Sequence, residues 1–478
     1  MWKNSSGPDP GFEMALSLYI MAGFLSSTSP TFGMRYCYQF VAIGVATIAL
    51  SGCLDPIASP EFEPFTLEEQ VLGDAKLING QLLGQTALRT EAGKDDPDEI
   101  RIIITFMDPL GDAHGFLERH GFLERHGFLE RHNLAGQTTE LSAAVKFDKA
   151  GIQERFGLSK DDDIVMPALT YLLAQPELAQ IEPDLRVQSE SVVMSPAGDN
   201  QTTPWSIPYV GAPILGLDYS NIELYVLDTR VNEDDVNLVE EIEFTEKMGK
   251  DQFTHGYHIA GTAGAEDNDT GVVGVAPGVP VHNMVVLNKY GMTSMSIAID
   301  AVNTIIERKQ ANRTKDMIMS VSFGAYIGGP WKTALDEALT HAANEGVIVV
   351  VSSGNDGLEA ANVTPAHAEG VITVGSHGPA GKHSWFSNYG STVDILAPGE
   401  DILSLGRISR KKIELLVGSG TSFAVPHVTG ALAAVLAVTP GMGAEQALSQ
   451  ISSEACITSA PANTTAMCVN LEQITGSD

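Results

Sequence analysis

Apolar and polar positions alternate in two different rhythms along the second half of the chain. Short runs of β-branched residues bounded by turn residues predict buried strands at residues 224–228, 282–287, 317–323, 347–351 and 371–374. Longer stretches predict helices at residues 294–309, 333–344, 422–438 and 444–454. Strands that alternate with helices predict a doubly wound α/β fold, in which helices cover both faces of a parallel sheet. Functional side chains are then expected at the carboxyl ends of the strands.

The first part of the chain divides by composition into several segments. Residues 34–53 begin with a cation, continue with an apolar stretch too short to span a bilayer, and end in Leu-Ser-Gly-Cys. This pattern is typical of a bacterial lipoprotein signal and predicts that Cys53 carries lipid; a plain secretory signal with a chance cysteine is the alternative. Residues 1–33 are then a misassigned start or an extended leader, and residues 54–98 form a linker.

Residues 99–190 predict a small α+β domain, with strands at 99–106 and 179–187 and a helix at 166–175. Within it the hexapeptide HGFLER occurs three times in succession, from residue 114 to residue 131. On a helix the copies point their Phe-Leu pairs in different directions, so they cannot form a single apolar stripe. We interpret the repeat as an insertion; metal binding by its evenly spaced histidines is the alternative.

The net charge and the cysteine content indicate which classes of partner and which cellular compartment to expect. Asp and Glu outnumber Lys and Arg by 60 to 28, giving a net charge of −32. This argues against nucleic acid as a partner, because phosphate binding needs basic patches. Outside the signal region the cysteines are Cys456 and Cys468. We expect these two to form a disulfide in an exported protein; two free buried thiols are the alternative.

Four polar residues stand where the predicted elements begin or end. Asp228 ends a buried strand, His255 opens a short helix in THGYHIAG, and Asn355 lies in a Gly-Asn-Asp-Gly turn after another strand. Ser422, in GTSFAVPH, stands at the start of an apolar helix, and Pro426 is expected within its first turn, where proline is tolerated. If each residue is taken singly, the alternative for Ser422 is an ordinary N-cap serine. The alternative for Asn355 is an ordinary turn residue.

Together these segments resemble the subtilisin family of serine proteases, and most closely its proteinase K branch, over roughly residues 204–478. The resemblance implies that Ser422 is the nucleophile, that His255 is the general base, and that Asp228 orients the imidazole. It also implies that Asn355 donates its side-chain amide to the oxyanion. Such chemistry acts on protein or peptide substrates and requires no cofactor.

The same resemblance implies a substrate cleft. Ser322, Phe323 and Gly324 match the edge that pairs with the substrate backbone, and Gly354 would line the opposite wall of the first specificity pocket. We see no charged residue at the floor of that pocket, so we expect apolar or aromatic residues before the cut. Asp394 matches a calcium-binding aspartate of the proteinase K branch; a surface carboxylate without metal is the alternative.

Residues 99–190 resemble an inhibitory propeptide of ferredoxin-like form, which would act as an intramolecular inhibitor. The peptidase domain, residues 198–478, would begin after a self-cleavage near residues 197–201. Because the lipid on Cys53 belongs to the precursor side of this cut, cleavage would release a monomeric mature domain into the periplasm or the exterior.

The chain departs from the family pattern at Arg230, Tyr257 and Val425. Arg230 follows Asp-Thr where the family has glycine, so a positive φ there would strain the backbone and a cation would lie near Asp228. A catalytically impaired, subtilisin-fold surface binding protein is therefore the alternative function. His258 lacks the spacing and the glutamate of a zinc protease motif, and we expect it to be a buried structural histidine. A lipase or esterase is excluded by the order of the residues.

Overall fold

The computed structural model describes residues 101–106, 142–146, 178–189, 192–194 and most of 201–475, together with isolated positions between 152 and 172. Residues 232, 246–253, 330, 410–411 and 455 are gaps in the longest of these ranges. All described residues belong to one of two compact units, Pro64–Asp478. The predicted signal, the linker and the HGFLER repeat lie outside the described residues.

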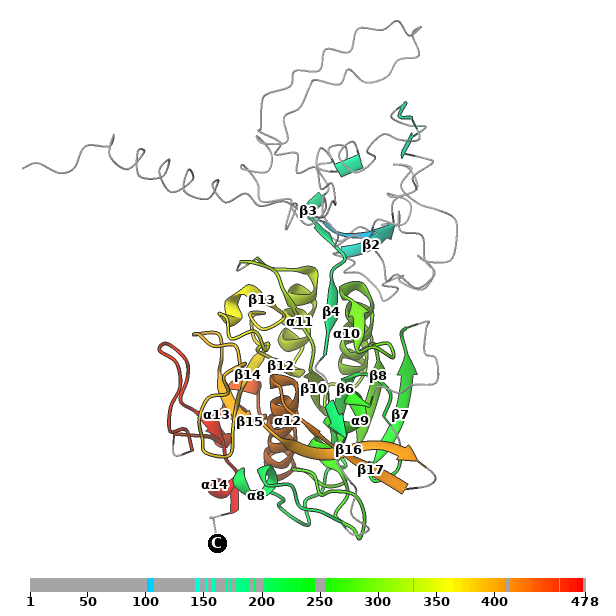
Figure 1. The fold of residues 1–478 in the computed structure, drawn as a ribbon. Helices are drawn as coiled ribbons and strands as arrows, with labels where there is room; N and C mark the ends of the chain where they lie inside the picture. The colour runs from blue at the N-terminus through cyan, green and yellow to red at the C-terminus, as the bar shows by residue number, and fades with distance from the viewer. Residues whose placement is uncertain are drawn as a thin grey trace, which may run out of the picture. The chain divides into compact units, whose positions relative to one another are not determined.

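A nine-stranded sheet forms the centre of the peptidase part, in the order β18-β19-β15-β14-β12-β10-β6-β8-β7 (Figure 1). All neighbouring strands are parallel except β18 and β19. Its strands are β6 (Ile222–Asp228), β7 (Leu238–Glu243), β8 (Val281–Val285), β10 (Asp316–Val321), β12 (Ile348–Ser352), β14 (Ile372–His377), β15 (Ile395–Pro398), β18 (Ser452–Ser453) and β19 (Cys468–Val469). Each predicted strand of this part is therefore present, with ends that differ by a few residues.

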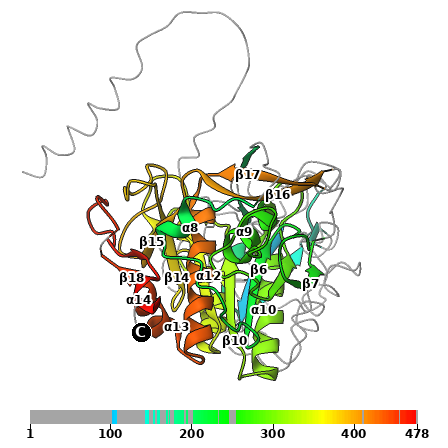
Figure 2. The same ribbon diagram turned by 90° about the horizontal axis from the view of Figure 1, so that it is seen from below.

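Helices cover both faces of this sheet. Residues of β6 alternate between two apolar cores: Leu224 and Val226 pack in the core that contains α9 (His255–Gly264) and α12 (Thr421–Val438). Tyr225 and Leu227 belong to the other core, with α10 (Met295–Ala311) and α11 (Ala334–Asn344). This two-sided burial confirms the doubly wound α/β fold. Figure 2 shows α9 and α12 side by side on their face.

The helix α12 is apolar on every side because it lies in the interior. By length and composition it could cross a membrane, but 89% of the relevant stretch is buried in the protein. Its burial agrees with the prediction for residues 422–438.

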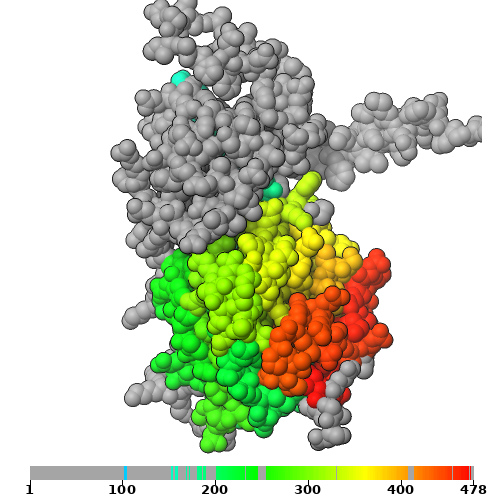
Figure 3. Space-filling view, turned by 180° about the vertical axis from the view of Figure 1, so that it is seen from behind, coloured from blue at the N-terminus to red at the C-terminus, as the bar shows by residue number. Residues whose placement is uncertain are grey.

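Several smaller elements surround the sheet. The hairpin β16 (Ile402–Ser409) and β17 (Lys412–Gly418) was not predicted, and β17 ends shortly before α12. Short elements also occur as α8 (Ser206–Tyr209), β9 (Met292–Ser294), β11 (Ala325–Tyr326), η2 (Ala360–Asn362), β13 (Val363–Thr364), α13 (Ala444–Ile451) and α14 (Glu472–Thr475). Seen from behind, the C-terminal residues, coloured orange to red, lie on the surface beside the yellow middle segments (Figure 3).

Before the peptidase part, β2 (Ser142–Lys146), β1 (Arg101–Phe106) and β3 (Leu178–Pro183) form a three-stranded antiparallel sheet with β1 in the middle. The prediction of one strand over residues 179–187 is wrong: β3 ends at Pro183, and a second strand, β4 (Arg186–Gln188), pairs with β9. Proline has no N–H to donate, which explains the break. Of the predicted helix at 166–175, only scattered helical positions are described, and the ferredoxin-like form stays a prediction.

Candidate active site

Asp228 and His255 form a buried pair at the carboxyl end of the central strand β6. The Nδ1 atom of His255 lies 2.9 Å from Oδ1 and 2.8 Å from Oδ2 of Asp228, and neither residue has any exposed surface. The backbone N–H of Thr229 donates to the same carboxylate at 2.7 Å. A carboxylate that accepts from Nδ1 fixes the tautomer, so the imidazole carries its lone pair on Nε2.

A glycine allows helix α9 to begin this close to the strand. The N–H of Gly256 donates to the hydroxyl of Thr229 at 2.9 Å. A Cβ atom on Gly256 would lie 2.4 Å from the carbonyl oxygen of Thr229 and 3.1 Å from the Cβ of Asp228. A larger residue would therefore push the imidazole and the carboxylate apart.

Ser422 is the second residue of α12 and is 2% exposed. Its hydroxyl donates to the carbonyl of Ser322 at 3.0 Å, and the hydroxyl of Ser322 donates to the carbonyl of Ser422 at 3.1 Å. The prediction that Pro426 lies in the first turn is wrong, since α12 begins at Thr421. Pro426 therefore deprives the Ser422 carbonyl of its helical donor, and Ser322 supplies another.

The start of α12 lies against the start of α9. The ring of Phe423, next to Ser422, is 5.2 Å from the ring of His255 and 4.6 Å from that of His258. The structure thus brings the acid and the imidazole into direct contact, and it places the serine's helix beside them. The hydroxyl of Ser422 donates to the carbonyl of Ser322 rather than to the imidazole.

Asn355 follows β12 and is tied to the first turn of α12. Its Oδ1 accepts the N–H of Thr421 at 2.7 Å, and the N–H of Gly354 donates to the hydroxyl of Thr421 at 3.2 Å. Because the amide oxygen accepts from the residue before Ser422, the donor end of this amide, Nδ2, is oriented relative to the serine.

Asn388 holds this loop in shape, and the sequence analysis did not identify it. Its Oδ1 accepts the N–H groups of Asp356 at 3.0 Å and Leu358 at 2.9 Å, while its Nδ2 donates to the carbonyl of Ser353 at 2.9 Å. Gly354 has φ +99°, and a Cβ there would lie 2.3 Å from Nδ2 of Asn388. The only signal in the sequence is an asparagine in the turn-like stretch FSNYG.

The predicted cleft edge is occupied by the chain itself. Gly324 pairs with Gln188: the N–H of Gln188 donates to the carbonyl of Gly324 at 3.2 Å, and the reverse bond is 3.3 Å. Phe323 is 1% exposed and packs in the core with α10 and α11. Its contribution to the edge is therefore made by the backbone.

Arg230 neither strains the backbone nor reaches Asp228. It is not among the described non-glycine residues with positive φ. Its guanidinium donates to Glu241 at 2.7 Å and also pairs with Glu243, both on β7. The expected backbone strain at Arg230 is therefore wrong. The expected cation beside Asp228 is also wrong, because the neighbouring strand β7 supplies two carboxylates that bind the guanidinium.

Tyr257 and Val425, the two other residues that differ from the family pattern, lie in the interior of the protein. Tyr257 is buried, and its hydroxyl donates to the carbonyl of Asp234. Val425 is buried within α12. Neither side chain is exposed, and both pack in the core that contains α9 and α12.

His258 is buried and uses Nε2 to contact the carbonyl of Ile402 at 3.0 Å. Burial and the neighbouring His255 lower the pKa of His258 to about 3, so it is neutral at physiological pH, in agreement with the structural role predicted. The carboxylate of Asp394 accepts the N–H of Thr373 at 2.8 Å, and burial raises its pKa. Among the described residues no group of three or more His, Cys, Asp or Glu could hold a metal; calcium at Asp394 stays a prediction.

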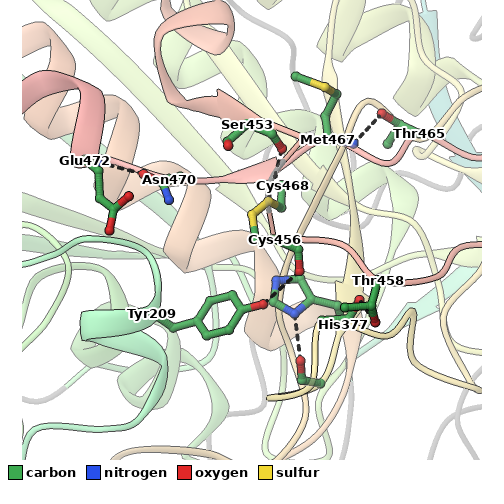
Figure 4. The surroundings of a disulfide bond; sticks show 12 residues. Tyr209, His377, Ser453, Cys456, Thr458, Thr465, Met467, Cys468, Asn470 and Glu472 are labelled. Atoms are coloured by element: carbon green, nitrogen blue, oxygen red, sulfur yellow. Dashed lines mark hydrogen bonds between the residues drawn. A yellow bond between two sulfur atoms is a disulfide. The ribbon is translucent and has the colours of Figure 1, made fainter.

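A disulfide joins Cys456 to Cys468 (Figure 4). The hydroxyl of Tyr209 donates to the carbonyl of Cys456 at 2.9 Å. Cys468 belongs to β19, near one edge of the sheet, whereas Asp228 ends a strand in its interior. The bond therefore ties the C-terminal segment to the sheet.

The chain is similar to one family model and to several known proteins. The family model described as "Subtilase family" matches residues 153–472. The extracellular serine proteinase of Thermus sp. (strain Rt41A) is 35% identical over 282 residues, which cover 56% of this chain and 63% of that protein. Subtilisin DY of Bacillus licheniformis is 32% identical, over 53% of this chain and 92% of its own length. Proteinase R of Parengyodontium album is 29% identical, over 54% of this chain and 67% of its own length.

Proposed function

Since the chain belongs to the subtilase family of serine peptidases, we propose that it is an exported, self-processing serine endopeptidase that cleaves proteins through an acyl-enzyme intermediate. The observation that carries this proposal is the fully buried Asp228–His255 pair beside the start of helix α12, whose second residue is Ser422. A buried carboxylate that orients an imidazole next to a helix-terminal serine is the arrangement that acyl transfer needs.

In the proposed mechanism Nε2 of His255 takes the proton of Ser422 as the serine oxygen attacks the substrate carbonyl. Rotation of the serine side chain about Cα–Cβ redirects its hydroxyl from the carbonyl of Ser322 toward the imidazole. Asp228 stabilises the imidazolium that forms, and His255 then returns the proton to the leaving amine. A water molecule repeats the cycle on the acyl-enzyme and releases the acid.

Asn355 would hold the negative oxygen of the tetrahedral intermediate, together with the backbone N–H of Ser422. Its amide is oriented by the hydrogen bond from Thr421 and its loop by Asn388. An oriented donor needs no reorganisation in the transition state, and in subtilisin such a donor lowers the barrier by about 3–4 kcal/mol.

Two further parts of the proposal concern export and inhibition. The lipoprotein-type signal ending at Cys53 supports export of a lipid-attached precursor, and the name of the Thermus relative describes that protein as extracellular. The pairing of β4 with β9 supports a role for the segment before residue 190 as an intramolecular inhibitor.

The proposal is tested by preparing the precursor, the Ser422→Ala variant and a Ser449→Ala control in parallel. Ser449 is an exposed serine on helix α13. We expect the wild type and the control to be cut, to label with a fluorophosphonate and to hydrolyse a peptide p-nitroanilide. Ser422→Ala should do none of these. Equal processing of all three proteins, or an unlabelled wild type, contradicts the proposal.

A further inference from the structure

Asn283 is a polar residue in the interior of the nine-stranded sheet. It belongs to β8, the strand between β6 and β7 (Figure 1), and it has no exposed surface. It stands directly opposite Val226, which packs in the core that contains α9 and α12, so its side chain is on the face where Asp228 meets His255. A buried amide needs hydrogen-bond partners, because the removal of its polar atoms from water is otherwise unfavourable.

The amide of Asn283 donates to two oxygens beside the end of β6. Its Nδ2 lies 3.1 Å from the carbonyl oxygen of Thr229 and 3.0 Å from Oε2 of Glu241, which stands opposite it on β7. Because a carbonyl and a carboxylate only accept, the nitrogen must be the end of the amide that faces them. The buried Oδ1 has no hydrogen-bond partner among the described residues. Such an oxygen is unfavourable, so the asparagine is explained by its two donated bonds and not by packing.

Glu241 extends this contact along the chain. Its Oε2 also accepts the N–H of Val231 at 3.1 Å, and its Oε1 accepts from Arg230 at 2.7 Å. The Asn283–Glu241 pair therefore binds residues 229, 230 and 231 in succession. Strand β6 ends at Asp228, so these three residues are held by side chains and not by the regular pairing of the sheet.

Thr229 connects the Asn283–Glu241 pair to the catalytic residues. Its N–H donates to Oδ1 of Asp228 at 2.7 Å, and its hydroxyl accepts the N–H of Gly256 at 2.9 Å, directly after His255. Its carbonyl is the oxygen that Asn283 binds. Because all three groups belong to one buried residue, a shift of the Thr229 backbone changes the contact with the carboxylate and the contact with α9 together.

We propose that Asn283 and Glu241 are positioning residues for the catalytic pair, a proposal that rests on the proposed peptidase function. They act through Thr229, whose carbonyl they fix. Thr229 in turn orients the carboxylate of Asp228 and the start of the helix that carries His255. Proton transfer from the serine depends on this geometry, because reacting groups must be held within a fraction of an ångström of their productive places.

The same arrangement gives Arg230 a place beside the site. Its guanidinium binds Oε1 of Glu241 and also Glu243, and its side chain is 40% exposed. It supplies a countercharge for the carboxylate that accepts from Val231 and Asn283. An exposed, flexible side chain constrains the backbone less than a direct bond to a peptide group does, so we expect the acceptor at position 241 to matter more than the cation.

The first test compares purified wild type, Asn283→Ala and Asn221→Ala, each left until self-processing is complete. Asn221 is the matched control, because its Nδ2 also donates to one carbonyl and one carboxylate, at the opposite end of β6. These acceptors are Thr314 at 3.2 Å and Asp316 at 3.1 Å. The readouts are kcat and KM for a peptide p-nitroanilide, the rate of labelling by a fluorophosphonate, and the melting temperature.

We expect both asparagine variants to melt at a lower temperature, because each loses two hydrogen bonds. Asn283→Ala should also lower kcat and the labelling rate by on the order of 10-fold to 100-fold, with KM within about twofold, because the reacting groups are displaced while the substrate cleft is not. Asn221→Ala should keep kcat within about twofold of wild type, because a purely structural loss does not alter the geometry of the folded site.

Variants of Glu241 separate its acceptor from its charge. Glu241→Gln keeps an acceptor oxygen for Val231 and Asn283 and should keep kcat within about threefold of wild type. Glu241→Ala should lose roughly tenfold. Glu241→Ala combined with Asn283→Ala should lose little more than Asn283→Ala alone, because residues that act as a unit are not additive. The two Glu241 variants decide the question by themselves if Asn283→Ala does not fold.

Three results overturn the proposal and leave the proposed function intact. The first is equal loss of kcat in Asn283→Ala and Asn221→Ala, and the second is a kcat of Asn283→Ala within about threefold of wild type. The third is a Glu241→Gln variant as slow as Glu241→Ala. A wild type that neither hydrolyses the peptide nor labels with the fluorophosphonate contradicts the proposed function instead.

Discussion

Gly256 offers the sharpest test of how the structure sets the catalytic pair. In Gly256→Ala the added Cβ would lie 2.4 Å from the carbonyl oxygen of Thr229, well inside ordinary contact distance. The obstacle is backbone directly after the strand that carries Asp228, so it cannot turn aside as a flexible side chain would. Relief requires movement of several tenths of an ångström to about 1 Å between helix α9 and strand β6.

That movement separates two groups that now lie 2.8 Å apart. A displacement of about 1 Å of a catalytic group costs on the order of 100-fold in rate. Overpacking costs about 1–3 kcal/mol of stability, partly offset by the roughly 1 kcal/mol by which alanine favours a helix. We therefore expect Gly256→Ala to lose about 100-fold in kcat/KM and in the rate of self-processing while it still folds.

The assay combines single-turnover processing of the purified precursor with calorimetric melting. Gly443→Ala is the matched control, because no atom lies within 4 Å of its added Cβ and it caps a peripheral helix. The control should process at the wild-type rate. If Gly256→Ala keeps its rate within threefold of wild type, the close approach of α9 and β6 does not set the geometry of Asp228 and His255.

Three further predictions follow from the site and its surroundings. Asn355→Ala should lower kcat by roughly 10²–10³-fold with little change in KM, measured with a peptide p-nitroanilide, and a loss under tenfold contradicts its oxyanion role. Arg230→Gly should change kcat/KM by less than about threefold, since its cation is paired with Glu241 and an exposed pair contributes at most about 1 kcal/mol; a tenfold rise would show that the arginine impairs turnover. Burial lowers the pKa of His367, but hydrogen bonding to Asp336 at 3.2 Å outweighs it and the pKa is raised. The charged pair therefore stabilises the fold below pH about 6.5, and this contribution is lost as the pH rises through the higher folded pKa. In chemical unfolding, His367→Gln should lose about 1–3 kcal/mol near pH 5 and less near pH 9, and a larger loss at pH 9 would contradict the pairing.

Local pattern was enough to predict five adjoining strands of the sheet and the helices that cover it, because buried strands and helices each leave a periodic signature. The strands β7, β15, β18 and β19, at the two sides of the sheet, were not predicted. The acid, the base and the serine could be proposed because each stands at the end of such an element. The long-range partners could not: nothing near Asn388 in the sequence indicates that it binds the loop of Asn355, and nothing near Ser322 indicates that it pairs with Ser422. Periodicity also failed at residues 179–187, where Pro183 interrupts a run that otherwise reads as one strand.

Strand pairing with Gln188 and the position of Ser422 both depend on the same short segment, residues 322–324. Pro426 removes a hydrogen bond from α12, and a buried carbonyl without a donor costs about 1–3 kcal/mol. Ser322 supplies the missing donor, and its own carbonyl accepts the hydroxyl of Ser422. Gly324, two residues further along the chain, pairs antiparallel with Gln188. A peptide that joins this edge is therefore aligned with Ser422 by the backbone that also holds the serine, so the register of pairing determines which bond lies within its reach.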